Sequence, residues 1–136
     1  MLGKCGISRN SKILIVGCGN STLSEDLYAD GYENIFSIDL SKNVITIMNE
    51  RKKEMKINCS LNIYLDEVMD ARDLKYPNQY FDLIIEKTTI DTLLCMSDPF
   101  LNLALMMNEI QRVLKIDCFC LIISFGEPDK RVEHFV

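Results

Sequence analysis

The stretch K-I-L-I-V-G-C-G-N-S, residues 12–21, decides the fold of this chain. Its first half, Lys12 to Val16, is a short apolar run rich in β-branched residues, which is typical of a strand buried on both faces of a sheet. Its second half contains Gly17 and Gly19, and glycine lets the backbone turn tightly and approach a ligand closely. The stretch therefore predicts a buried strand that ends in a ligand-contacting loop.

Helices and strands are predicted to alternate along the rest of the chain. The signals are apolar residues at helical or strand spacing, bounded by glycine, proline or a capping side chain. They predict helices over residues 21–30, after Ser41 and after Ser97-Asp98-Pro99, and strands over residues 34–38, 61–65, 81–85 and 118–125. This alternation favours a single domain over residues 1–136 with an α/β, doubly wound, Rossmann-like fold and a parallel sheet of order 3-2-1-4-5.

Inward-facing residues are predicted for two of these helices. In the helix after Ser41, the inward residues are Val44, Ile45, Met48 and Met55, and residues 51–54 stay in water. In the helix after Pro99, the residues at helical spacing are Leu103, Met107, Ile110 and Leu114. The residues from Gly126 to Val136 read as a polar tail.

Composition excludes several classes of protein. The hydrophobic content of 48% is too high for a disordered chain, and apolar runs such as Ile13 to Val16 are too short to span a bilayer. A net charge of −5 argues against a nucleic-acid partner, which needs basic patches. Six cysteines, without a C-x-x-C pair and with one histidine, argue against a metal site and for free thiols in a reducing compartment. We therefore expect a cytoplasmic protein that binds neither membrane nor nucleic acid.

Polar or glycine-rich segments stand at four successive strand ends. Gly17 to Ser21 follow the first predicted strand and Asp39 follows the second, where a carboxylate can accept hydrogen bonds from ribose hydroxyls. Asp70 follows the third, placed to bind an adenine amino group with Ala71 against the ring, and Glu86 follows the fourth. In a doubly wound sheet, ligands bind beyond these strand ends. A lone glycine pair or aspartate is weak evidence, but the four together predict a nucleoside cofactor.

The spacing of the glycines separates two cofactors. The dinucleotide fingerprint G-x-G-x-x-G requires a third glycine for close packing of helix on strand. Counting from Gly17 and Gly19, that third position holds Thr22. S-adenosylmethionine (SAM) has no phosphates and does not need that geometry, and its sulfonium cation suits a cleft rimmed by carboxylates. The sequence favours SAM over NAD.

Four segments carry a resemblance to a known family. They are V-G-C-G-N-S (16–21), S-I-D-L-S (37–41), F-D-L-I-I-E-K-T-T-I-D (81–91) and R-V-L-K (112–115). Together they resemble the methyltransferase-like family of seven-strand, SAM-dependent enzymes, over roughly residues 12 to 135. Within that family the chain looks like the group that modifies elongation factor 1-alpha on lysine or on its N-terminal amine. That group has a D-K-G-T-L-D-type segment where this chain has Glu86 to Asp91, and an R-x-x-H-F tail like Arg131 to Phe135.

The resemblance implies roles for individual residues. The candidate cofactor-binding residues, for SAM and its product S-adenosylhomocysteine, are Gly17, Cys18, Gly19, Asn20, Asp39, Leu40, Asp70, Ala71 and Glu86. The candidate catalytic residues are Glu86, Lys87 and Asp91. A lysine acceptor must lose its proton, and carboxylates such as Glu86 and Asp91 would help it to do so. Asp91 has a second reading, as a charge at a helix N-terminus.

Three departures from the family set further expectations. Thr88 replaces a glycine and is expected to narrow the pocket, and Lys115 to Asp117 lack the usual proline–glycine–glycine turn. The family's N-terminal aromatic region and last two strands are expected to be missing, which would leave these residues nearly inactive alone. The resemblance implies a protein substrate; the alternative is a non-catalytic, SAM-binding scaffold protein. The strand at residues 118–125 is expected to form an open edge that self-associates, unless the tail folds over it.

Overall fold

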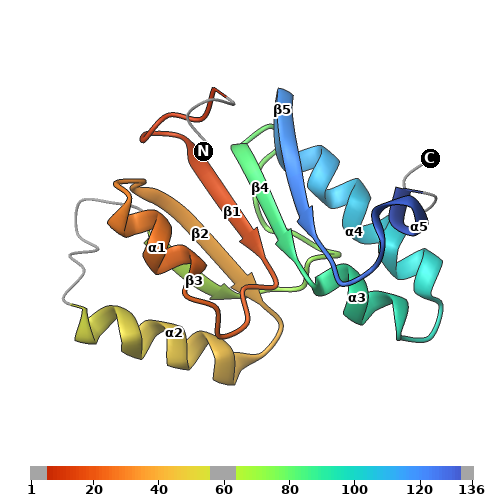
Figure 1. Ribbon diagram of the computed structural model, residues 1–136, viewed down its shortest axis with the longest axis horizontal. Helices are drawn as coiled ribbons and strands as arrows, with labels where there is room; N and C mark the ends of the chain where they lie inside the picture. Colours follow the sequence, from red (N-terminus) through yellow and green to blue (C-terminus); the bar gives the residue numbers. More distant parts are fainter. Residues whose placement is uncertain (1–5, 56–63, 133–136) are drawn as a thin grey trace.

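The computed structural model describes residues 6–55 and 64–132, and its strands form one parallel sheet (Figure 1). The strands are β1 (Lys12–Val16), β2 (Asn34–Asp39), β3 (Tyr64–Val68), β4 (Phe81–Lys87) and β5 (Leu114–Ile123). They lie in the order β3-β2-β1-β4-β5, and every neighbouring pair is parallel. The predicted α/β class and the strand order are confirmed.

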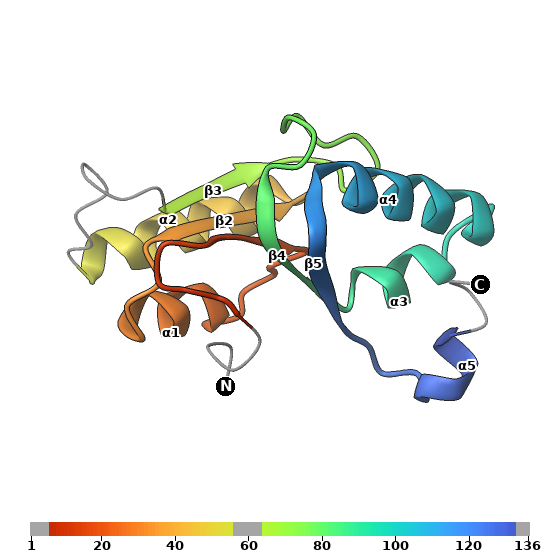
Figure 2. The ribbon, with the colours of Figure 1, turned by 90° about the horizontal axis from the view of Figure 1, so that it is seen from above.

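Helices cover both faces of the sheet, as Figure 2 shows for α1 and α4 on opposite sides. The helices are α1 (Leu23–Ala29), α2 (Lys42–Glu54), α3 (Thr89–Leu94), α4 (Pro99–Val113) and α5 (Pro128–Val132). Core residues of α1 and α2 pack with Ile13 and Ile15 of β1, and core residues of α3 and α4 pack with Leu14 and Val16. These four apolar residues of β1 are at most 1% exposed, so β1 is buried on both faces as its sequence predicts. No helix within the described ranges is long and apolar enough to cross a membrane.

Several predicted elements are shifted or new. The strand predicted at 61–65 falls partly outside the described residues, and β3 instead runs from Tyr64 to Val68. The fifth strand begins at Leu114 rather than Cys118, because β5 pairs with Phe81 before an irregularity in its register with β4. Helices α3 and α5 were not predicted. In α4 the buried apolar residues are Leu103, Met106, Ile110 and Val113. Met107 and Leu114, which were predicted to face inward, are only partly buried.

The charged end of α2 differs most from its prediction. The helix begins as expected after Ser41, whose side chain accepts a hydrogen bond from the backbone N–H of Val44. Met55, predicted to face inward, is 50% exposed. Lys52, predicted to stay in water, is buried, because it lies on the same helix face as Met48 and its ammonium group is 2.8 Å from the buried carboxylate of Asp66 in β3. A buried counter-ion on β3 thus makes Lys52 buried rather than exposed.

Strand β5 lies at an edge of the described sheet (Figure 1). Leu121 and Ile123 are 43% and 41% exposed, and β5 carries no charge from Cys118 onwards. An uncharged apolar edge offers unpaired backbone groups to another strand, so we predict that two copies of the chain associate through β5. Light scattering should show a mass that rises with protein concentration, and hydrogen exchange should show protection of the β5 amides that rises with it. A monomer at all concentrations, with those amides already protected, would contradict the prediction.

Candidate functional site

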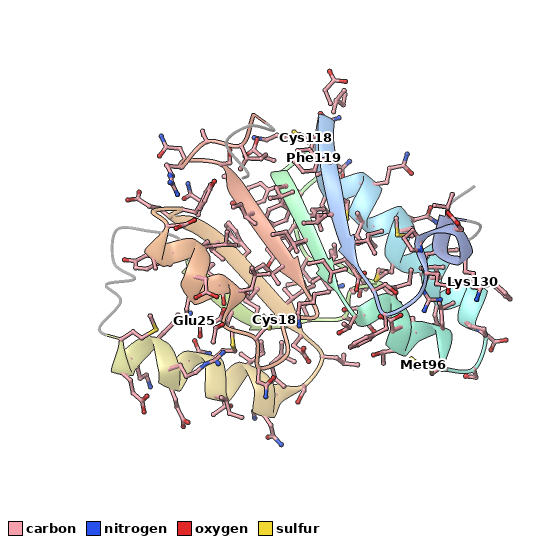
Figure 3. The ribbon with its side chains drawn as sticks, viewed as in Figure 1. Cys18, Glu25, Met96, Cys118, Phe119 and Lys130 are labelled. Carbon is pink, nitrogen blue, oxygen red and sulfur yellow. The ribbon has the colours of Figure 1, made fainter. Side chains whose placement is uncertain are left out.

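A cleft of about 230 Å³ lies at the carboxyl ends of β1, β2, β3 and β4. Four segments line it: Gly17 and Gly19 after β1, Ile38 to Leu40 at the end of β2, Met69 to Arg72 after β3, and, at the end of β4 and beyond it, Lys87 to Thr89 with Thr92, Leu93 and Met96. Met96 lies just beyond the end of α3 (Figure 3). The sheet thus brings together, in one cleft, the strand ends at which the sequence predicts a nucleoside cofactor.

The loop after β1 turns at two glycines in the left-handed region. Gly17 has φ +65° and Gly19 has φ +54°, where a side chain is strained. At Gly17 there is also no room, since a Cβ atom built there would overlap Oγ1 of Thr89 and lie 3.1 Å from its Cβ atom. At Gly19 a Cβ atom would meet nothing within 4 Å. Gly17 therefore lets α3 approach the loop closely, and Gly19 is required by conformation alone.

Asp39 joins this loop to the start of α2. Its Oδ2 atom accepts a hydrogen bond of 3.0 Å from the backbone N–H of Gly19, and its Oδ1 atom accepts one of 2.8 Å from that of Ser41. Each carboxylate oxygen can accept a second hydrogen bond from a ligand in the cleft. Leu40, the next residue, is 66% exposed and lines the cleft, which gives the site an apolar surface beside the carboxylate.

Asp70 lies in the cleft, paired with a neighbouring arginine. The guanidinium of Arg72 lies 2.7 Å from Oδ2 of Asp70 and extends to Oδ1 of Asn102 in α4, at 2.6 Å. Hydrogen bonding to Arg72 holds the pKa of Asp70 below its ordinary value, so this carboxylate is ionised at neutral pH. With Ala71 beside it, the cleft offers an acceptor and a small apolar surface at the place predicted for an adenine ring.

Glu86 lies beneath the cleft rather than in it. The side chain is fully buried, and its Oε1 atom accepts hydrogen bonds from the backbone N–H groups of Thr89 (2.5 Å) and Ile90 (3.0 Å) in the first turn of α3. A carboxylate is favourable at a helix N-terminus. Within the described residues, its other oxygen, Oε2, is buried without a hydrogen-bond partner. Glu86 therefore holds the start of α3, whose Thr89, Thr92 and Leu93 line the cleft.

The burial of Glu86 predicts a pH dependence of stability. Burial raises its pKa above the ordinary value of 4.5, although the N–H groups of α3 oppose the shift. A carboxyl group with a higher pKa in the folded than in the unfolded chain lowers stability as it ionises, so stability falls as the pH rises from 4.5 through the raised value. Glu86→Gln removes this fall.

The test compares denaturant unfolding of the wild type and Glu86→Gln from pH 4 to pH 8. The free energy of unfolding of the wild type, minus that of the variant, should decrease as the pH rises. The contributions of the other carboxyl groups to the free energy of unfolding cancel in this difference, because those groups are the same in both chains. A difference that does not change with pH would show that the pKa of Glu86 is not shifted, and one that increases would show that the folded chain favours its ionised form. Either result would contradict the prediction.

Lys87 and Thr88 line the cleft directly after Glu86. Thr88 has φ +63°, which is strained for a β-branched residue. Its backbone N–H donates to the carbonyl oxygen of Ile123 at the end of β5, at 2.9 Å, and its carbonyl oxygen accepts from the N–H of Thr92. A residue in the left-handed conformation is thus needed here to end β4 and begin α3, which is consistent with a glycine at this position in the resembled family.

The described residues that line the cleft do not include Asp91. Its Oδ1 atom accepts from the hydroxyl of Ser124 (2.6 Å) and from the guanidinium of Arg131 (2.7 Å), and its Oδ2 atom accepts from the backbone N–H of Phe125 (3.1 Å). These bonds hold the pKa of Asp91 below its ordinary value against the opposing effect of burial. Asp91 lies in the first turn of α3, as its second reading as a charge at a helix N-terminus predicts. It also connects α3 to the end of β5 and to α5, which the sequence does not predict.

Two further predicted residues lie outside the cleft. Cys18 is 3% exposed and packs in the core beside α1 and α2, where burial raises the pKa of its thiol to about 12 (Figure 3). Asn20 is exposed, and its backbone carbonyl accepts a hydrogen bond from Arg51. Sequence reasoning missed the cleft residues Met69, Arg72, Thr89, Thr92, Leu93 and Met96. The last four belong to α3 or its end, so recognition of that short helix would have found them.

Comparison with known proteins agrees with this geometry. The model of a methyltransferase domain family matches residues 7–134. The eEF1A lysine and N-terminal methyltransferase of Xenopus laevis is 36% identical over 134 residues, which cover 95% of this chain and 19% of that protein. EEF1A lysine methyltransferase 4 of Mus musculus is 30% identical, with 91% and 49% covered. A SAM-dependent methyltransferase of Methanosarcina mazei has the same fold, with a TM-score of 0.74 and 19% identity over 98% of this chain and 61% of that one.

These matches extend over almost all of the chain, although the chain spans only about a fifth to a half of the two curated relatives. The family match includes every segment that lines the cleft. The chain belongs to the methyltransferase domain family, and the predicted resemblance to the SAM-dependent enzymes that modify elongation factor 1-alpha is confirmed.

Proposed function

We propose that the protein is a methyltransferase that binds SAM in the cleft at the strand ends and methylates an amine of a protein. The observation that carries the proposal is the convergence of Gly17, Gly19, Asp39 and Asp70 on one cleft. The chemistry of these groups fits a nucleoside, since carboxylates accept from ribose hydroxyls and an adenine amino group and the glycines admit close contact. When bound, SAM supplies a methyl group on a sulfonium cation.

The cleft residues divide into two parts in this proposal. Asp39 holds the ribose, and Leu40, Asp70 and Ala71 surround the adenine ring. The remaining part of the cleft, lined by Gly17, Lys87, Thr88 and Met96, then receives the methyl donor and the acceptor amine. Transfer is a direct displacement, in which the amine nitrogen forms a bond to the methyl carbon as the carbon–sulfur bond breaks. The protein contributes mainly by alignment.

In this proposal, neither Glu86 nor Asp91 removes the proton from the acceptor amine. Glu86 is fully buried and Asp91 is hydrogen-bonded to Ser124, Phe125 and Arg131. Neither is among the described residues that line the cleft. We assign to both the positioning of α3. A lysine amine, with an ordinary pKa near 10.4, would lose its proton to water at the open side of the cleft.

Names of relatives point to the acceptor. Because the Xenopus and mouse relatives are named for the modification of eEF1A on lysine or at its N-terminus, we propose that protein as the substrate and the cytoplasm as the site of action. Free cysteines, of which Cys18 is buried, also favour a reducing compartment. The alternative is a scaffold protein that binds SAM without methylating a protein.

Two measurements test the proposal. Calorimetry with the 136-residue chain should show binding of S-adenosylhomocysteine and no binding of NAD. Radiolabelled SAM, added with the protein to a cell extract, should then label elongation factor 1-alpha. Binding without any labelled protein would favour the scaffold, and binding of NAD would contradict the cofactor assignment.

A further inference from the structure

Arg51, in the last turn of α2, reaches across to the glycine loop. Its Nη1 atom donates to the carbonyl oxygen of Asn20 at 3.0 Å, and its Nη2 atom donates to the carbonyl oxygen of Ser21 at 2.9 Å. These two carbonyl groups belong to the loop that follows Gly19 and leads into α1. Two parallel bonds from one planar guanidinium fix both the position and the orientation of a peptide segment.

A buried carboxylate holds the guanidinium in place. Oε1 of Glu25 lies 3.0 Å from Nη2 of Arg51, and the Glu25 side chain is only 7% exposed. Glu25 also accepts a hydrogen bond from the hydroxyl of Ser24 through its second oxygen, Oε2. A cation beside the N-terminus of α1 would be repelled by the helix dipole, and the carboxylate in the first turn of α1 offsets that repulsion.

The loop is therefore held by one residue before α2 and by another near the end of α2. Before α2, Asp39 accepts from the N–H of Gly19, and near the end of α2, Arg51 donates to the carbonyls of Asn20 and Ser21. Gly17 and Gly19, with the greatest conformational freedom of any residue type, would otherwise let this loop sample many conformations.

We propose that Arg51 is a positioning residue for the cofactor: it does not contact the ligand, but it fixes the loop whose backbone does. This inference rests on the proposed function. An ordered loop binds without the loss of conformational entropy that a mobile loop incurs, so removal of Arg51 weakens binding even though no ligand contact is removed. The 51–54 run, expected from sequence to be only a solvated face, thus contributes to the site.

The experiment measures the affinity for S-adenosylhomocysteine by calorimetry at 10 °C, after circular dichroism has shown each variant to be folded. Arg51→Ala should weaken binding about tenfold or more. Arg51→Lys, which keeps the charge but not the planar pair of donors, should fall between this variant and the wild type. Arg51→Met, which keeps the apolar stem, replaces Arg51→Ala if the latter does not fold.

Two control variants separate positioning from general stability. Lys53→Ala removes an exposed cation from the same helical turn, and Ile45→Ala removes a buried side chain from the inward face of α2. Both should bind within about twofold of the wild type, although Ile45→Ala lowers the stability of the fold by removing buried apolar atoms. Hydrogen exchange should become faster at residues 17–21 in Arg51→Ala only.

Three outcomes are decisive. Wild-type affinity in Arg51→Ala, or an equal loss of affinity in Ile45→Ala, would overturn the positioning role. Unchanged exchange at residues 17–21 in Arg51→Ala would overturn it as well. Failure of the wild-type chain to bind S-adenosylhomocysteine contradicts the proposed function instead, so the two failures are distinguishable.

Discussion

Gly17→Ala is expected to destabilise the chain by about 2–5 kcal/mol, from strain of a side chain at positive φ and from overpacking. The new Cβ atom would overlap Oγ1 of Thr89, so either the loop or the first turn of α3 must move. Both line the cleft, and we therefore expect the affinity for S-adenosylhomocysteine to fall about a hundredfold or more, which corresponds to about 2.8 kcal/mol. Denaturant unfolding and calorimetry measure the two effects.

Gly19→Ala is the matched control for stability. Gly19 has a similar φ, but a Cβ atom there meets nothing within 4 Å, so only the conformational strain of about 1–2 kcal/mol remains. Thr89→Ala, combined with Gly17→Ala, should recover part of the lost stability, because it removes the atom that the new Cβ would overlap. Equal destabilisation by Gly17→Ala and Gly19→Ala, without recovery in the double variant, would show that the contact with Thr89 does not matter.

Asp39→Ala is expected to weaken the binding of S-adenosylhomocysteine about 10- to 150-fold. We assign to this carboxylate the hydrogen bonds of the ribose, and a hydrogen bond to a charged group contributes about 1.5–3 kcal/mol. The substitution also leaves the N–H of Gly19 without its acceptor, which loosens the loop. Calorimetry at constant ionic strength measures the change in affinity.

Asp39→Asn separates the two contributions of this side chain. Its one carbonyl oxygen can accept from Gly19 or from Ser41 but not from both in the present geometry, so an intermediate affinity is expected. An affinity for S-adenosylhomocysteine that is unchanged in Asp39→Ala would remove Asp39 from the site and leave the ribose to another group of the cleft.

The central strands could be predicted from the sequence because their own residues carry the signal. Ile13 to Val16 of β1 are all apolar, as residues of a strand covered on both faces must be. At the edge of the sheet this signal fails: β3 has the sequence Y-L-D-E-V, in which the buried Asp66 is stabilised by Lys52 of α2. Because this strand is stabilised by a distant counter-ion, it has no apolar run. The sequence therefore predicts a strand too early, at the more apolar residues 61–65.

The sequence predicts which strand ends form the site, but it does not predict which side chains at those ends reach the cleft. Asp39 and Asp70 line the cleft as expected, because the ends of parallel strands meet at one edge of the sheet. Glu86 and Asp91 are not among the described residues that line it: Oε1 of Glu86 accepts from N–H groups of α3, and Asp91 is paired with Arg131. Helix α3 was missed because its first turn is bound by Glu86, which precedes the helix, and no side chain at the usual capping position makes that bond.

The pair formed by Lys52 and Asp66 also has a consequence for folding. Burying an ion pair adds little net stability, but leaving one of its charges buried alone costs about 3–5 kcal/mol. If β3 slipped by one residue along β2, Asp66 would turn to the other face of the sheet and Lys52 would lose its counter-ion. The pair therefore selects against misaligned forms of β3, a strand with few apolar residues. It does so by destabilising the misaligned structures rather than by stabilising the correct one.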